Sequence, residues 1–433
     1  MASLLASQSF ALASPRSPLG GKAKLRLPWP LGSIDPHRLD DFAAAIMGPA
    51  LFDSLYAIDA SGEVVPALAE SLPTSDGAGG FRITMRQGLT TAHGSAIDAR
   101  DASLSIARAR SHGGAGWLAA LPSPKREGEK SLTFATTDAA ALSRALASPI
   151  TAIVPLSFDP QRPDGTGPFR ADRKDSMLVL TRNARAAMGP SLLDEIDVAV
   201  GDDLAASLRA FESGEDDIGW LGSGLHEPRT GSKTFDAGAI GWAVLVIGRE
   251  AASWDSPGIA QRVCDGIAPS RLAYLSMGPA WTTTGAVPWS GPPIDLLAPS
   301  DSPWLAELAK AVAAAISQPS HEVTPRFVSS ADFAQRRKGR NFALAVDAVR
   351  MLGTGALSAM TALASVDPSS SATDLVKHPP KLAEVPARSL TRTLRLGVLG
   401  EVRVQGGRIP DLSLPLGRSG IDWGLASRAH KHA

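Results

Sequence analysis

The fold of this chain is decided by Ile34-Asp35-Pro36-His37, followed by Ala50-Leu51-Phe52-Asp53-Ser54-Leu55-Tyr56 and Val65-Pro66-Ala67-Leu68-Ala69-Glu70-Ser71. Each piece alone fits a helix start or a turn. None has the residue types and spacing of a catalytic nucleophile, a metal site or a phosphate-binding loop. The order of the pieces is the informative feature, so its meaning depends on the segments that follow.

Further segments follow in order, at 80–89, 93–102, 165–169, 180–183, 212–218, 259–271 and 278–288. Examples are Gly165-Thr166-Gly167-Pro168-Phe169 and Glu212-Ser213-Gly214-Glu215-Asp216-Asp217-Ile218. Over roughly residues 24–290 the order and spacing resemble the signature of extracellular solute-binding proteins of family 5. These are dipeptide- and oligopeptide-binding proteins that serve ABC importers. The chain departs from the pattern at 93–102, where one residue is missing and Ala102 replaces a valine.

The resemblance implies an α/β, two-lobed periplasmic binding protein of type II (cluster C-like), with an inter-lobe ligand cleft and a hinge. Alternating strand and helix patterns independently predict α/β lobes. Among them, Ala99 to Arg110 has helical spacing with Asp98 as its N-cap, and 242–247 is an apolar run typical of a strand buried on both faces. Two strands near 241–248 and 380–395 are expected to form the hinge, about which the lobes close on a ligand. A single continuous sheet is not expected. The implied ranges are 23–48, 164–245 and 385–433 for lobe I, 49–163 for its inserted subdomain, and 246–384 for lobe II.

Bulk composition excludes several function classes. Basic and acidic residues balance at 43 each, so charge suggests no nucleic acid and no anionic membrane as a partner. The single Cys264 excludes an intramolecular disulfide framework. The sequence contains no stretch of 18 apolar residues, the length that a membrane-spanning helix needs. Residues 1–22 are either the remnant of a secretory signal, because an apolar run ends in Ala11-Leu12-Ala13, or a disordered leader.

No feature of the sequence predicts an enzyme. The eight histidines never show metal-ligand spacing, and we expect neither a metal nor a cofactor. Pro168 follows Gly167 and is incompatible with the phosphate-cradling turn of a dinucleotide site. The basic run Arg336-Arg337-Lys338 predicts a solvated surface, with a contact to the transporter as the alternative.

Two groups of residues are candidate ligand contacts. The resemblance implies that the loop Leu31-Gly32-Ser33, after the first strand, touches the solute. Tryptophan is unusually common, with nine copies against two tyrosines, and an indole can line a pocket while its N–H bonds to a polar ligand atom. Several lie where the resemblance places the cleft, although core packing is the alternative for each one: Trp29, Trp220, Trp242, Trp281, Trp289 and Trp423. Of these, Trp220, Trp242, Trp281 and Trp289 are the predicted ligand contacts, and at least two of the four are expected to line the cavity.

The segment 341–352 departs from the peptide-binding pattern. The resemblance implies an aspartate that pairs with the α-amino group of a peptide, and Leu352 occupies that position. Because a buried ammonium without a carboxylate is costly, ordinary peptides are expected to bind poorly. Asp347 could substitute if the register slips. Arg350 could face the cleft and attract an acidic group, and an apolar or mixed ligand fits these residues better.

The sequence therefore predicts a periplasmic, monomeric binding protein that captures a small-molecule ligand for the permease of an ABC transporter. Three alternatives stay open. One is an oligopeptide-binding protein with an atypical site. Another is a ligand sensor that presents its closed form to a receptor. The third is an enzyme on the same scaffold, for which no convergent acid, base or nucleophile is visible in the sequence.

Overall fold

A computed structural model of the chain describes residues 18–201, 204–220, 229–278, 280–281, 285–353, 356–367, 369, 387–417 and 420–429. The expectation for the leader falls mainly on residues 1–17, which lie outside this set. Within the described part, no helix is both long enough and apolar enough to cross a membrane.

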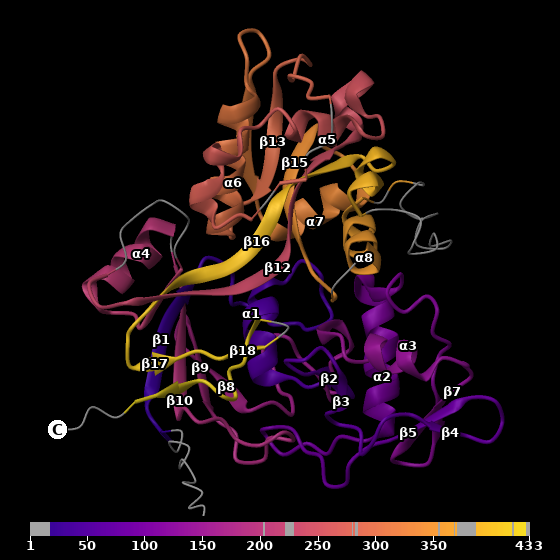
Figure 1. The fold of residues 1–433 in the computed structure, drawn as a ribbon. Helices are drawn as coiled ribbons and strands as arrows, with labels where there is room; N and C mark the ends of the chain where they lie inside the picture. Colours follow the sequence, from indigo (N-terminus) through magenta and orange to yellow (C-terminus); the bar gives the residue numbers. More distant parts are fainter. Residues whose placement is uncertain are drawn as a thin grey trace, which may run out of the picture.

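One sheet of ten strands organises the molecule, in the order β14-β13-β15-β12-β16-β11-β1-β10-β9-β8. Figure 1 shows it running diagonally through the centre of the molecule. The bounds of its strands are β1 Lys22–Leu27, β8 Phe169–Lys174, β9 Met177–Arg182, β10 Glu195–Val200, β11 Ile218–Trp220, β12 Lys233–Ile247, β13 Ile294–Pro299, β14 Val323–Val328, β15 Leu344–Arg350 and β16 Leu396–Arg408.

The continuity of this sheet corrects the expectation that no single sheet would be formed. It follows from the length of β12 and β16, which have 15 and 13 residues. Fifteen residues of strand extend about 50 Å, enough to cross from one half of the molecule to the other. At one end β12 pairs with β15, and at the other β16 pairs with β11. Three register shifts between β12 and β16, near Asp236, Ala239 and Ala243, are places where such a pair bends.

The second strand expected at the hinge begins later in the sequence than predicted. It was expected near 380–395, whereas β16 starts at Leu396. Ala387–Arg392 is a short 3₁₀-helix, and residues 380–386 lie outside the described set.

Helices cover the two halves separately. In the half that we call the β15 half, β13, β14 and β15 pack with α6, α7 and α8 (Figure 1). Its helices are α5 Ile259–Cys264, α6 Pro303–Ile316, α7 Ser330–Gly339 and α8 Ala356–Val366. In the β1 half, β1 and β8–β11 are accompanied by α1 Phe42–Leu51 and α4 Leu204–Ser213.

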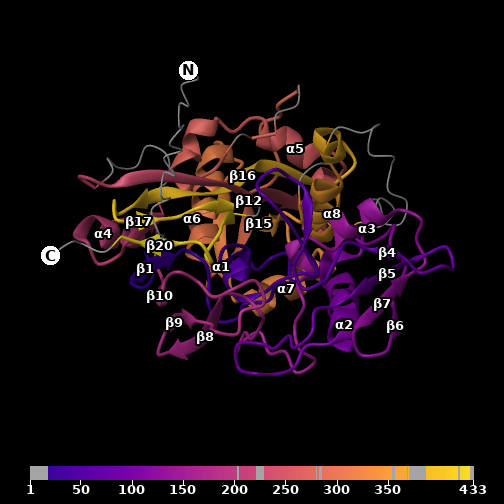
Figure 2. The same ribbon diagram turned by 60° about the horizontal axis from the view of Figure 1, so that its bottom comes forward.

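A small subdomain extends the β1 half, seen in Figure 2 around α2 and a second sheet of order β4-β5-β7-β6. The predicted cap of its helix α2 is confirmed, because Asp98 accepts hydrogen bonds from the backbone N–H of Arg100 and Asp101 and Asp101 bonds back to Asp98. Its elements are β2 Tyr56–Ile58, β3 Val64–Pro66, β4 Thr74–Ser75, β5 Phe81–Thr84, α2 Ala99–Ala109, β6 Lys125–Glu127, β7 Ser131–Phe134 and α3 Ala139–Ala145. Short hairpins complete the chain, with β17 Leu412–Ser413, β18 Leu416–Gly417, β19 Gly420–Ile421 and β20 Ser427–Arg428.

The sequence segments that stood out form contacts with one another. Arg108 of α2 makes two hydrogen bonds to the carboxylate of Asp35, at 2.7 and 2.6 Å, and the buried ring of His37 bonds to the carbonyl of Ala152 at 2.8 Å. The turn at Gly165–Gly167 passes so close to the end of α1 that a Cβ on Gly167 would lie 2.6 Å from the carbonyl carbon of Leu51. These contacts hold α2 and the Gly165–Gly167 turn against residues 35–51, the segment that contains α1.

Candidate functional site

Two groups of cavities lie where the β1 half and the β15 half meet. The first, which we call the α7 cleft, has a volume of about 410 Å³. Residues between β1 and α1 line it on one side, and α7, β15 and the start of α6 line it on the other. Its wall includes Gly32, Ser33, Arg38, Asp40, Asp41, Asp301, Ser330, Arg337 and Asp347.

A chain of charges crosses the α7 cleft. Arg38 donates two hydrogen bonds to the carboxylate of Asp40, at 2.9 and 2.8 Å. The same carboxylate lies 3.8 Å from Arg337 of α7, and Arg337 donates a 2.6 Å hydrogen bond to Asp347 of β15. The four side chains therefore join the two halves by alternating charges.

The surroundings of these groups shift their pKa values in ways that fit the pairing. Burial works against ionisation of Asp40, but the hydrogen bond from Arg38 and the charge of Arg337 hold its pKa below the usual value. Burial raises the pKa of Asp347, although Arg337 opposes the shift. The nearby charge of Asp347 raises the pKa of Arg337. The nearest partner of each cation in the cleft is already a carboxylate of the protein.

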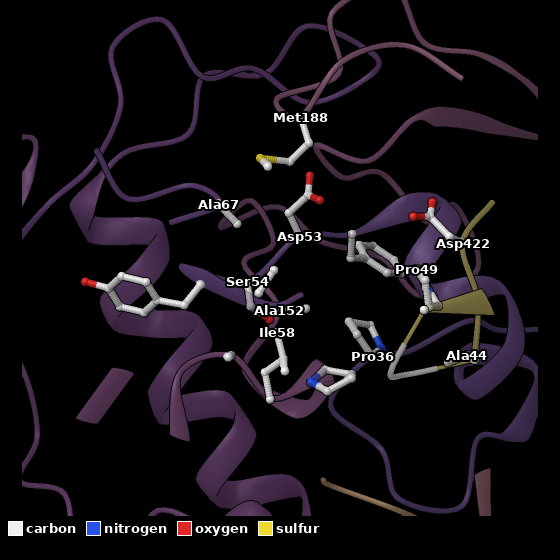
Figure 3. Close-up of a pocket in the computed structure, with 18 of the residues that line it drawn as sticks. Pro36, Ala44, Pro49, Asp53, Ser54, Ile58, Ala67, Ala152, Met188 and Asp422 are labelled. Carbon is white, nitrogen blue, oxygen red and sulfur yellow. The ribbon is translucent and has the colours of Figure 1, made fainter. Parts of the chain in front are cut away.

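The second group, which we call the Arg350 cavities, consists of two neighbouring spaces of about 160 and 220 Å³. Both are bordered by Arg350, Ile58, Ala147 and Pro149. Figure 3 shows the larger one, where Pro36, Ala44 and Pro49 lie opposite Ile58, with Asp53 and Met188 at its upper end. The smaller one lies between α3, β12 and the end of β15, and Trp117, Arg144, Met351 and Leu352 contribute to its wall.

Five of the ten predicted ligand contacts border these cavities. Gly32, Ser33 and Asp347 line the α7 cleft, and Arg350 and Leu352 line the Arg350 cavities. Leu31 is buried beside the cleft and is not part of its wall. The positions of Arg350 and Asp347 are three residues apart on β15, so that this one strand supplies both sites.

The four predicted tryptophans pack in the hydrophobic core. Trp242 lies edge-on to Trp281 with ring centres 6.2 Å apart, and Trp289 lies 4.5 Å from Trp254. Trp220 borders only a space of about 10 Å³. Their role as ligand contacts stays a prediction. Trp29 does line the α7 cleft, where its ring stacks on Phe42 at 4.6 Å.

Sequence reasoning missed several residues of these walls. Trp117, half-buried, donates its indole N–H to the carbonyl of Ala145 and leaves its ring on the smaller Arg350 cavity. Arg337 was expected to be solvated, yet it is paired with a buried carboxylate. Asp40 lies three residues after His37 of the Asp35-Pro36-His37 segment, and this closeness in sequence was the signal that could have indicated it.

Among the described residues, no group of three or more histidines, cysteines, aspartates or glutamates could hold an ion. Cys264 is buried, and burial raises the pKa of its thiol, so it is not a reactive nucleophile.

Part of the chain matches a known protein family. Residues 63–233 match the family described as "Bacterial extracellular solute-binding proteins, family 5 Middle". This match confirms, over residues 63–233, the resemblance read from the sequence. No curated protein sequence matches the chain.

Solved structures confirm the two-lobed fold class over nearly the whole chain. The oligopeptide-binding protein AppA from Bacillus subtilis, in complex with a nonapeptide, has a TM-score of 0.73 and 14% identity, covering 96% of this chain and 100% of that one. NikA from Staphylococcus aureus, in complex with Ni(L-His)2, has a TM-score of 0.69 and 15% identity, covering 94% and 100%. MoaA from A. tumefaciens R10, in complex with mannopinic acid, has a TM-score of 0.73 and 14% identity, covering 96% and 100%.

Proposed function

We propose that this family 5 protein captures a small solute between its β1 and β15 halves and delivers it to the permease of an ABC importer. The observation that carries the proposal is the set of cavities whose walls come from both halves. A ligand held there contacts both halves at once, so that binding favours the closed arrangement. The similar structures hold a peptide, an opine or a nickel complex, so that the fold alone fixes no ligand class.

We further propose that the ligand is apolar or mixed and is not an ordinary peptide. Leu352, at the position where a peptide-binding relative would carry an aspartate, borders the smaller Arg350 cavity with an apolar side chain. Asp347 does not replace that aspartate, because Arg337 already occupies its carboxylate. An α-ammonium entering this cavity would lose its water without gaining a counter-charge, which is unfavourable by several kcal/mol.

We also propose the division into lobes that the resemblance implies. Residues 246–384 form one lobe, and residues 23–48, 164–245 and 385–433 form the other, with 49–163 as its subdomain. The register shift between Ala243 and Val244 of β12 lies next to the boundary at 245/246 and supports a hinge there. We propose a periplasmic monomer, because the walls of the cavities come from two halves of one chain and need no second copy.

Calorimetric titration of the purified full chain with unmodified di- and tripeptides tests the ligand class. We expect weak binding for all of them, with a peptide-binding member of the family as the positive control. Affinities tighter than micromolar for several peptides would show that the α-ammonium has a partner and that the reading of Leu352 is wrong.

A further inference from the structure

Arg350 is a buried cation with unused hydrogen-bonding capacity. Its side chain is 4% exposed, and Nη1 donates to the carbonyls of Pro36 and Arg38 at 3.3 and 3.1 Å. Its Nε is buried without a partner, and Nη2 makes no hydrogen bond within the described part of the chain. The edge formed by Nε and Nη2 is the edge that binds a carboxylate with two parallel hydrogen bonds.

The acidic groups nearest to Arg350 are used elsewhere. Asp35 is held by Arg108 through two hydrogen bonds, and Asp40 is held by Arg38. The carboxylate of Asp41 accepts from the backbone N–H of Ala44 and of Asp35. Among the described residues none forms an ion pair with Arg350, although the charges of Asp41, Asp35 and Asp40 act on it from a distance.

The smaller cavity beside Arg350 matches an anion with an apolar body. Among the described residues of its wall, the charged ones are Arg350 and Arg144, an exposed arginine near the end of α3. The rest of the wall includes the indole of Trp117 and the side chains of Ile240, Met351 and Leu352. A space of about 160 Å³ is similar to an engineered protein cavity that binds benzene.

We infer that the solute is an organic carboxylate with a compact apolar body, whose carboxylate binds the guanidinium of Arg350 while its body lies against Trp117 and Met351. This inference rests on the proposed function and adds the chemical class of the ligand. Arg350 supplies the buried, oriented charge, and Arg144 adds a second positive charge at the same wall.

Fragment titration of the full chain tests the class directly. Benzoate, benzamide and benzylamine share one ring and differ in the charge of the attached group. We expect benzoate to bind, benzamide to bind about tenfold more weakly or worse, and benzylamine not to bind, because a charged hydrogen-bonded pair contributes more than a neutral one. Absence of benzoate binding, or equal binding of benzamide, overturns the inference.

Variants locate the site. Arg350→Met should lower benzoate affinity by about tenfold or more, Arg350→Lys should retain part of it, and Arg100→Met should leave it unchanged. Arg100 is an exposed arginine on α2 that borders neither Arg350 cavity, so it controls for the loss of one charge. Unchanged affinity in both Arg350 variants overturns the inference, and the fragment series remains decisive if Arg350→Met does not fold.

Failure of the inference differs from failure of the proposed function. A neutral or cationic small molecule that binds in these cavities keeps the solute-binding function and rejects the carboxylate. A chain that binds no small molecule of any charge rejects both.

Discussion

The guanidinium of Arg337 on α7 lies 3.8 Å from the carboxylate of Asp40, which precedes α1. These two residues belong to opposite halves of the molecule, and nearly 300 positions of sequence separate them. Asp347 and Arg38 extend the contact on either side. This contact is a charge connection across the α7 cleft, and a rearrangement of the two halves must stretch or break it.

Removal of Arg337 should destabilise the fold strongly. Arg337→Met leaves the buried Asp347 without its cation, and uncompensated buried charges typically lower the free energy of unfolding by about 3–5 kcal/mol. The neighbouring Arg336→Met is the matched control, because its partly exposed i,i+4 pair with Asp332 contributes about 0.5 kcal/mol or less. Urea unfolding of both variants measures the difference, and similar losses would contradict a special role for Arg337.

Asp41 should make the fold less stable as pH rises, which is the opposite of the usual effect of a carboxylate. Removal from water raises its pKa to about 6 from the usual 3.8. Between these values the folded chain retains a proton that the unfolded chain has released, so that stability is lost as pH rises through the window. Above pH 6, the free energy of unfolding should be lower by about 1–3 kcal/mol than below the window.

The variant Asp41→Asn isolates this effect, because asparagine can still cap α1 but does not titrate. Burial also lowers the pKa of His37, to about 4, which opposes the effect of Asp41 in the same window. His37 is present in both proteins and cancels in their difference. We expect the variant to gain stability relative to the parent as pH rises from 4 to 7 in urea unfolding, and a constant difference would contradict the shifted pKa.

The turn at Gly165–Gly167 should be intolerant of added volume. A Cβ on Gly167 would lie 2.6 Å from the carbonyl carbon of Leu51 and 2.9 Å from the carbonyl oxygen of Ala50, so Gly167→Ala should lower the free energy of unfolding by about 1–3 kcal/mol. Gly32→Ala is the control, because no atom lies within 4 Å of its added Cβ. Thermal melting compares them, and equal melting temperatures would show that the turn can move.

Ligand binding should be reported by Trp117. Its ring borders the smaller Arg350 cavity, whereas Trp289 is buried against Trp254. We expect a change of intrinsic fluorescence on benzoate binding that Trp117→Phe largely removes and Trp289→Phe retains. Loss of the signal in the second variant alone would place the ligand elsewhere.

The fold could be predicted largely because its signals are local. Asp98 caps α2 as its position before an amphipathic segment indicated, and the apolar run 242–247 is a buried part of β12. The order of short segments from Ile34 onward carried the family resemblance, since each segment makes a turn or contact that depends on specific residue types.

The site was less predictable because its contacts are distant in sequence. No local pattern indicates that Arg337 meets Asp347 and approaches Asp40, and a basic run reads as solvated until the fold is known. Composition cannot distinguish a core indole such as Trp289 from one beside a cavity such as Trp117, because both positions favour the same apolar side chain. The continuous sheet was missed because strand length beyond the apolar segment of β12 is not encoded in hydrophobicity.

Native mass spectrometry tests the central claim most directly, with the ligand-stripped full chain equilibrated against a mixture of small metabolites and peptides. We predict one non-peptide adduct bound one-to-one, negatively charged when released, and absent when Arg350→Met is treated in the same way. A chain that stays bare in the presence of the mixture, or that carries a series of peptides, would contradict the account.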